Sequence, residues 1–225
     1  MGCCESRAKI GGKRTLGVSN VKAAQAVNKM KENNAKIEKF VMDIIQKGQP
    51  WTDPDFPPAL RSLYDPNLDE GDINKYKSFE WKRFKEIAKS PAMFRDGIDP
   101  NDINQGQLGD CYFLAVLSSL AEFPDRVSAL FVTKELNAAG IYLVRFFING
   151  NETPVIVDDH LPCNKNGGLA FASSRDDEMW VSILEKAWAK LHGTYARTEG
   201  GLPCFACSHL VGVPSESFLH DDVED

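Results

Sequence analysis

A single cysteine lies between a short glycine-containing loop and a long apolar segment within residues 104–120. If the apolar segment is a helix, Cys111 opens its first turn, where the positive end of the helix macrodipole favours the thiolate and makes the sulfur a nucleophile. Gln105 lies six residues earlier, from where a loop can fold its amide back beside the sulfur as an oxyanion donor. A lone cysteine at a helix start is most often a buried structural residue. The neighbouring Gln105, Gly109 and Asp110 shift this balance, and we predict a nucleophile at Cys111.

The pattern Gln-Gly-x-x-Gly-Asp-Cys-x-x-Leu-Ala around Cys111 resembles the active-site signature of the calpains. Calpains are calcium-dependent cysteine endopeptidases with a papain-like catalytic core, which cut intracellular proteins at a few positions. The resemblance extends over about residues 51–215, and one departure is Tyr112, where the family usually has tryptophan. Further motifs follow in the family's order: Asp55–Pro58, Trp81–Arg83, Asp96–Gly97, Val157–Pro162, Glu178-x-Trp180, Leu184–Ala187 and Gly200–Gly201.

The resemblance implies an α+β fold class and two parts of the chain. Residues 51–225 are expected to form the first, nucleophile-bearing lobe of a papain-like catalytic domain, with a small antiparallel sheet. Residues 1–50 are expected to form a basic N-terminal segment with one amphipathic helix. Residues 49–76 are rich in proline and aspartate, which is typical of an irregular connector over the surface.

The remaining elements follow from local patterns. Residues 125–136 are predicted to continue as helix after the nucleophile helix. Residues 141–148 are apolar and β-branched or aromatic, and with residues 154–157 they predict a hairpin. A further helix is expected from about Glu178 to Leu191, capped by Asp176 or Asp177 and stopped by Gly193.

The chemistry of a thiol protease requires more than the sulfur. A histidine takes and returns the proton, and a third group, typically asparagine, orients it. In papain-type enzymes both lie about 130–150 residues beyond the cysteine, whereas 114 residues follow Cys111 here. The chain has four histidines, His160, His192, His209 and His220, and none stands in the Gly-His-Ala context that the resemblance requires. The Asn-Pro-Trp-Gly context of the orienting asparagine is also not present. We therefore expect the lobe with the histidine and asparagine to be absent from these residues.

Two functions remain open on this evidence. In the first, the chain belongs to a calcium-dependent, calpain-like endopeptidase of protein substrates, a second lobe or partner protein supplies the base, and the chain alone is inactive. In the second, the chain is a natural short form, a non-catalytic, membrane-tethered regulatory or scaffolding protein. The retained Cys111 and Gln105 favour the first, and so does the end of the match near residues 212–220, where the family's first lobe finishes.

Calcium is the cofactor that the resemblance implies. Calcium takes several oxygen ligands from carboxylates and backbone carbonyls in a flexible arrangement. The positions that align with the family's calcium site are Arg95 and Gly97 through their carbonyls, Asp102 through its side chain, and Glu178. Without the resemblance, Asp102 would be an ordinary turn or cap residue. No redox or nucleotide cofactor is expected.

The N-terminus indicates a membrane anchor. Residues 1–47 contain ten lysines and arginines against four acidic residues, so they carry +6 while the rest of the chain carries −12. The start Met-Gly-x-x-x-Ser matches an N-myristoylation pattern at Gly2, and Cys3 and Cys4 offer palmitoylation sites. Since one myristoyl chain binds only marginally, the cysteines and basic residues would supply the second signal on an anionic surface. We predict a cytoplasmic protein attached peripherally to the inner leaflet.

One amphipathic helix is predicted between this anchor and the catalytic part. Ser19 or Asn20 would cap it, and Gly48 with Pro50 would stop it. Its apolar stripe would pack on the protease body or another helix, or else contact a membrane or a partner. The stripe consists of Val27, Met30, Ile37, Val41 and Ile44.

Other functional classes find little support. Six cysteines without framework spacing or a signal peptide favour a reducing compartment. Cys204, Cys207 and His209 resemble part of a zinc site, but a fourth ligand is missing nearby, and the strand-to-helix context of a thioredoxin-like pair is not evident. No phosphate-binding glycine loop or basic-aromatic patch is present, so nucleotide and nucleic-acid binding are not expected.

Overall fold

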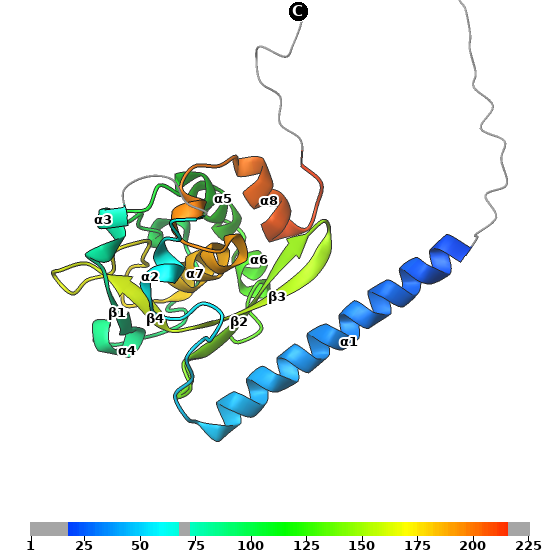
Figure 1. The fold of residues 1–225 in the computed structure, drawn as a ribbon, viewed down its shortest axis with the longest axis horizontal. Coiled ribbons are helices and arrows are strands. Elements are labelled where there is room, and N and C mark those ends of the chain that lie inside the picture. Colours follow the sequence, from blue (N-terminus) through cyan, green and yellow to red (C-terminus); the bar gives the residue numbers. More distant parts are fainter. Residues whose placement is uncertain (1–17, 68–72, 216–225) are drawn as a thin grey trace, which may run out of the picture. The chain divides into compact units, whose positions relative to one another are not determined.

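The computed structural model describes residues 18–67 and 73–215, with side chains described from residue 25 onward. It divides into two compact units, one up to Lys36 and one from Ile37, and the fold below is that of the second. Helices and two small antiparallel sheets make up this unit, which confirms the α+β class (Figure 1). The described elements are α1 (Val18–Lys47), α2 (Leu60–Leu63), α3 (Ile73–Lys77), β1 (Glu80–Arg83), α4 (Phe84–Ile87), the 3-10 turn η1 (Pro100–Asp102), α5 (Cys111–Ala121), α6 (Pro124–Ala129), β2 (Ile141–Ile148), β3 (Asn151–Asp158), β4 (His160–Cys163), α7 (Trp180–His192), η2 (Ala196–Thr198) and α8 (Pro203–Val211).

The hairpin of β2 and β3 follows the sequence prediction. Ile148 pairs with Asn151 at its closed end, and Asn149 and Gly150 form the turn with φ angles of 51° and 74°. Two-residue hairpin loops require such positive φ angles, which asparagine and glycine adopt most readily. The strand predicted at 141–148 therefore has the predicted bounds, and its partner begins three residues earlier than predicted.

Both faces of β2 are buried. Successive side chains of a strand point to opposite sides, and each side of β2 packs against a different hydrophobic cluster. Tyr142 and Val144 join the main hydrophobic core, which α5 and α7 also line. Ile141 and Leu143 face the other way and pack with Val41, near the C-terminal end of α1. A strand covered on both sides explains why the segment is apolar throughout rather than alternating.

Helix α7 lies at the centre of the main core and is almost entirely buried. The ring of Trp188 stacks on Phe113 of α5, with ring centroids 4.9 Å apart and planes 14° from parallel. Gly193 ends the helix with a φ of 105°, as predicted. The helix begins at Trp180, and Asp176 and Asp177 do not cap it: they lie in the preceding loop, with φ angles of 55° and 59°.

One expectation about local structure was wrong, and some elements were not predicted. Helix α6 ends at Ala129 instead of continuing to residue 136, because residues 130–133 form hydrogen bonds along the edge of β2. The short sheet of β1 and β4 was not predicted, and neither was α8, which carries Cys204 and Cys207. The connector at residues 49–76 is mostly irregular, as expected, but contains the single-turn helix α2 and the start of α3.

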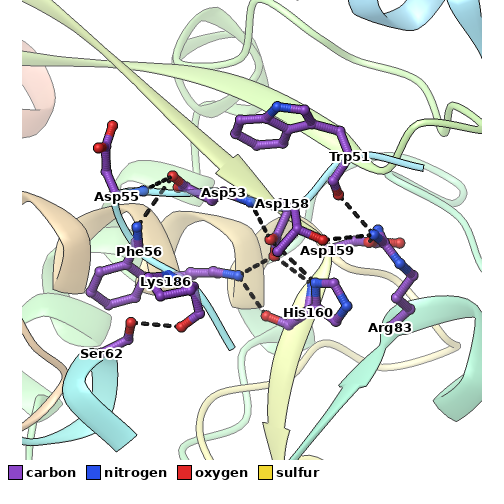
Figure 2. Close-up of polar contacts among 12 residues, drawn as sticks. Trp51, Asp53, Asp55, Phe56, Ser62, Arg83, Asp158, Asp159, His160 and Lys186 are labelled. Carbon is purple, nitrogen blue, oxygen red and sulfur yellow. Dashed lines mark hydrogen bonds and ion pairs between the residues drawn. The ribbon is translucent and has the colours of Figure 1, made fainter. Parts of the chain in front are cut away.

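A buried polar network connects the start of the connector to the sheets and α7 (Figure 2). The carboxylate of Asp158 accepts hydrogen bonds from the Asp53 backbone N–H (2.7 Å), the His160 backbone N–H (2.9 Å) and the Lys186 ammonium (2.5 Å). Burial alone would raise the pKa of Asp158, but His160 and Lys186 together hold it well below its ordinary value. Arg83 pairs with Asp159 and also donates to the Trp51 carbonyl oxygen (2.7 Å).

Candidate active site

The predicted nucleophile opens helix α5. Cys111 is the first residue of the helix, its side chain is exposed, and its thiol is free. The backbone N–H groups of Phe113 and Leu114 both donate to the Asp110 carbonyl oxygen (2.9 and 3.2 Å), which starts the helix. Within the part of the chain that the structure describes, the Cys111 backbone N–H has no acceptor. An exposed thiol and a backbone N–H without an acceptor among the described residues thus lie at the positive end of one helix.

The loop that precedes Cys111 is held against a neighbouring extended segment. Asn104 exchanges two backbone hydrogen bonds with Ser173, and the Gln107 N–H donates to the Ala170 carbonyl oxygen (2.8 Å). Gly106 lies where a Cβ atom would come within 2.3–2.4 Å of the Phe171 backbone. Only glycine permits this approach, which fixes the path of the loop towards Cys111.

The loop also positions the predicted oxyanion donor. The side-chain amide of Gln105 donates to the Leu108 carbonyl oxygen (3.1 Å), three residues before Cys111. One of the two amide hydrogens is therefore used to orient the group, and the other remains for a ligand. This hydrogen bond holds the Gln105 side chain against its own loop, in the residues that immediately precede Cys111.

The glycine pair Gly200–Gly201 lies close to Gly109 and to the ring of Tyr112, the residues on either side of Asp110 and Cys111. The Gly200 N–H donates to the Gly109 carbonyl oxygen (2.9 Å), which places residues 200–201 beside the loop. A Cβ atom at Gly201 would come within 2.5 Å of the Tyr112 ring, so this position also requires glycine. The Tyr112 hydroxyl accepts a hydrogen bond from the Trp188 indole (3.1 Å). Tyrosine at position 112 thus joins α5 to α7.

Asp110 and Glu185 were not predicted as site residues. Asp110 occupies the N-cap position of α5, yet its carboxylate caps no backbone N–H group of the helix. Its side chain is completely buried, and Glu185 of α7 is buried in the same region. Sequence patterns show that both positions belong to family motifs, but they do not show that two acids meet in the core.

The described histidines are engaged elsewhere. His160 lies with its Nδ1 atom 3.2 Å from an oxygen of Asp158. The Nδ1 atoms of His192 and His209 lie 2.9 and 2.6 Å from the carbonyl oxygens of Trp188 and Phe205. Within residues 18–67 and 73–215, no histidine forms a hydrogen bond with Cys111. His220 lies outside the described residues.

The four predicted calcium ligands are Arg95, Gly97, Asp102 and Glu178. They line one hollow of about 380 Å³ between the loop before η1 and the loop before α7. Backbone hydrogen bonds join the two loops, including one from the Arg175 N–H to the Asp102 carbonyl oxygen (3.2 Å). Glu178 accepts from the Arg95 backbone N–H and from the Trp180 indole (3.1 Å). The structure therefore brings these residues together across about 80 positions of sequence.

Five carboxylates and two arginines, Arg95 and Arg175, line this hollow. Burial raises the pKa of Glu178, and the negative charges of Asp102 and Asp176 raise it further, against the hydrogen bond from Arg95. A positive ion would relieve this repulsion, and the oxygen donors are of the kind that calcium takes. Among the described residues, no three histidine, cysteine, aspartate or glutamate side chains converge as a metal-binding group, so an ion here would also require backbone carbonyl oxygens.

The predicted lipidation residues Gly2, Cys3 and Cys4 lie outside the described residues. No helix in the described part of the chain is long and apolar enough to cross a membrane. Cys204 and Cys207 lie on α8 as free, partly buried thiols, and His209 lies two residues after Cys207 on the same helix.

Comparison with known proteins matches the same residues to one family. The family described as calpain family cysteine protease matches residues 51–225. A calpain-type cysteine protease of Zea mays is 43% identical over 189 residues, which cover 80% of this chain and 9% of that protein. Calpain-5 of Caenorhabditis elegans is 36% identical over 206 residues (85% and 31%). The calpain-2 catalytic subunit of Bos taurus is 38% identical over 163 residues (71% and 23%). The chain thus spans less than a third of each of these relatives.

Proposed function

The chain belongs to the calpain family of cysteine proteases, and from that premise we propose that it carries the nucleophile of a calcium-dependent endopeptidase that cuts protein substrates. The observation that supports this best is the exposed thiol of Cys111 at the start of α5, beside a backbone N–H without an acceptor. Both groups are needed for acyl transfer from an amide, one as nucleophile and one as oxyanion donor.

In the proposed reaction, the Cys111 thiolate attacks the carbonyl carbon of the scissile peptide bond. A carbon–sulfur bond forms, and the negative charge on the carbonyl oxygen is stabilised by the Cys111 N–H and the free amide hydrogen of Gln105. The carbon–nitrogen bond then breaks as the leaving amine takes up a proton. Water hydrolyses the thioester, releasing the acid and restoring the thiol.

The proton transfers require a base, and none of the histidines in the described part of the chain forms a hydrogen bond with Cys111. We propose that a second lobe or a partner protein brings a histidine, oriented by an asparagine, to the sulfur. The positions of His160, His192 and His209, each engaged away from Cys111, support this view. By itself, the chain would hydrolyse peptides negligibly.

Calcium is the proposed regulator of this lobe. The loop carbonyls of Arg95 and Gly97 and the carboxylates of Asp102 and Glu178 would hold it. When bound, the ion would neutralise the carboxylates and join the loop before η1 to the loop before α7. Since η1 leads directly into the loop of Gln105, the order of this region would affect the approach to Cys111.

We further propose that the protein is held at the inner face of a cytoplasmic membrane. Acyl chains on Gly2 and on Cys3 or Cys4 would provide the two signals that stable attachment needs. The basic residues of the first 47 positions would add attraction to anionic lipid. Flotation with vesicles, comparing the wild type with Gly2→Ala, tests this part independently of catalysis.

The nucleophile is tested by alkylation. Purified protein is treated with iodoacetamide at neutral pH, with and without calcium, and each cysteine is quantified by mass spectrometry. We expect Cys111 to react faster than Cys204 and Cys207, which are also free and partly accessible. Cys163 is buried, and burial raises the pKa of its thiol to about 11, so it serves as the slow reference. If Cys111 reacts no faster than an ordinary thiol, the alternative gains support: a non-catalytic regulatory or scaffolding protein of calpain ancestry.

A further inference from the structure

The carboxylate immediately before the nucleophile has an unusual environment. Asp110 is 0% exposed, and apart from its own backbone N–H neither of its side-chain oxygens has a hydrogen-bond donor among the described residues while Glu185 is ionised. An aspartate at an N-cap position normally accepts from a backbone N–H two or three residues on. Here the side chain does not do so, and it is directed into the core instead.

The group that Asp110 meets there is a second acid. The carboxyl groups of Asp110 and Glu185 are within hydrogen-bonding reach of each other. Glu185 is 2% exposed, and its two oxygens accept from the Ala172 backbone N–H at 2.9 and 3.1 Å. Two ionised carboxylates would have no donor between them, so the contact is a hydrogen bond only if one of them holds a proton.

Among the described residues, no positive charge compensates this pair of acids. Lys186, the next residue on α7, is turned to Asp158. The other titratable groups near the pair are Cys111 and Tyr112 on α5, Tyr195 immediately before η2 and Glu199 just after η2. The Tyr195 hydroxyl is buried without a hydrogen-bond partner among the described residues, and Glu199 is paired with Lys75 and Tyr76.

The electrostatic consequence is the same for both acids. Burial raises the pKa of Asp110 to about 6, and burial together with the charge of Asp110 raises the pKa of Glu185 well above its ordinary value. Two neighbouring carboxyl groups that are buried away from water cannot both be ionised at neutral pH. The positive end of α5 favours the charge on Asp110, so Glu185 is the partner that stays protonated.

We propose that Asp110 and Glu185 share one proton, and that the resulting hydrogen bond is a positioning device that fixes the nucleophile loop to α7. The Glu185 hydroxyl donates to the Asp110 carboxylate, while the other Glu185 oxygen accepts from the Ala172 N–H. Ala172 belongs to the extended segment that also holds Asn104 and Gln107. The protonated side chain of Glu185 thus connects α7, the start of α5 and the extended segment that supports the loop of Gln105.

The role assigned to this pair rests on the proposed function only in that Cys111 is the nucleophile. The shared proton itself is measurable without any peptidase activity. Three variants separate the possibilities. Glu185→Gln is a neutral replacement whose amide can donate to Asp110 and accept from Ala172. Glu185→Ala removes both hydrogen bonds. Glu122→Gln, at the exposed end of α5, is the matched control.

The direct test is infrared difference spectroscopy of the purified chain at pH 7. We expect the wild type and Glu122→Gln to show the carbonyl stretch of a protonated carboxylic acid, and Glu185→Gln to lack it. Because Glu185→Gln preserves the hydrogen bonds, this measurement stands even if Glu185→Ala fails to fold. A wild-type spectrum without a protonated carboxyl band would overturn the proposal.

The positioning role is tested by hydrogen exchange of peptides from residues 104–114. We expect Glu185→Ala to speed exchange there by about tenfold or more, because the loop loses its attachment. The exchange rate of Glu185→Gln should stay within about twofold of the wild type. An equal increase of the exchange rate in both variants would contradict a neutral Glu185. If the protonated band is present but Cys111 alkylates as an ordinary thiol, the pair is upheld and the proposed catalytic function fails.

Discussion

The indole N–H of Trp188 donates a hydrogen bond to the hydroxyl of Tyr112 over 3.1 Å. Trp188 belongs to the buried centre of α7, and Tyr112 is the residue next to Cys111, so the bond ties the nucleophile helix to the core. A tryptophan at position 112, as is usual in the family, has no hydroxyl to accept this bond. The tyrosine of this chain therefore contributes an interaction that the family pattern does not.

Replacing this hydroxyl is expected to cost stability. In Tyr112→Phe, the buried Trp188 N–H loses its acceptor, and we expect the free energy of unfolding to fall by about 1 kcal/mol. Urea unfolding measures the change. Ser119→Ala removes an exposed hydroxyl from the same helix and serves as the control, with a change within about 0.5 kcal/mol. Equal effects in both variants would mean that the Trp188 bond contributes nothing.

The path of the nucleophile loop predicts a contrast between two glycines. A Cβ atom at Gly106 would lie 2.3 Å from the Phe171 backbone, whereas one at Gly109 would meet its nearest atom, in Glu199, at 3.6 Å. We expect Gly106→Ala to cost about 1–3 kcal/mol and to change the rate of Cys111 alkylation. Gly109→Ala should be tolerated. A tolerated Gly106→Ala, measured by urea unfolding, would contradict the described packing of the loop.

The buried ion pair of Lys186 and Asp158 is expected to be sensitive to loss of one partner. Lys186→Met leaves the Asp158 carboxylate buried without its cation, and we expect a loss of about 3–5 kcal/mol. Lys190→Met also removes an ion pair, with Asp53, but Lys190 is partly exposed and the loss should be smaller. Thermal or urea unfolding of the two variants gives the comparison, and a similar loss in both would contradict this ranking.

Much of this structure could be predicted from sequence because it depends on local patterns. The start of α5 at Cys111, the strand at 141–148 and the end of α7 at Gly193 each follow from periodicity, turn residues or a glycine stop. The resemblance to a family also located the four residues that line the hollow at η1. These features are encoded within a few neighbouring positions or within a known motif.

The rest depends on contacts between distant segments. Residues 130–133 leave the helix because the edge of β2 offers hydrogen bonds, which no local pattern reveals. The pairing of β1 with β4 joins segments about 80 residues apart. The meeting of Asp110 with Glu185 is of the same kind, since each acid occupies an unremarkable place in its own motif. Local sequence patterns therefore do not reveal which distant residues are buried together.

The raised pKa of Asp110 predicts the direction in which stability changes with pH. An aspartate in the unfolded chain releases its proton near 3.8, whereas Asp110 in the folded protein keeps it to about 6. Between these values the folded protein binds more protons, so this group lowers the free energy of unfolding as pH rises from about 4 to about 6. In Asp110→Asn the titrating carboxyl group is absent, so this fall should disappear. Urea unfolding at several pH values, with Glu122→Gln as control, measures the difference, and parallel curves for all three proteins would contradict the assignment.

Calcium binding at the hollow beside η1 predicts a thermal shift that depends on Asp102. An ion that binds only the folded protein stabilises it by about 2.7 kcal/mol at a concentration a hundredfold above Kd, which corresponds to roughly 5–10 °C in Tm. In Asp102→Asn one of the two proposed carboxylate ligands is neutral, so most of the shift should be lost. Glu178→Gln should behave in the same way, although it also weakens the hydrogen bond from Arg95. Asp125→Asn, an exposed acid on α6 away from the hollow, controls for the general effect of charge. If calcium raises Tm equally in the wild type and in Asp102→Asn, the ion binds elsewhere, and the hollow is an ordinary acidic junction between two loops.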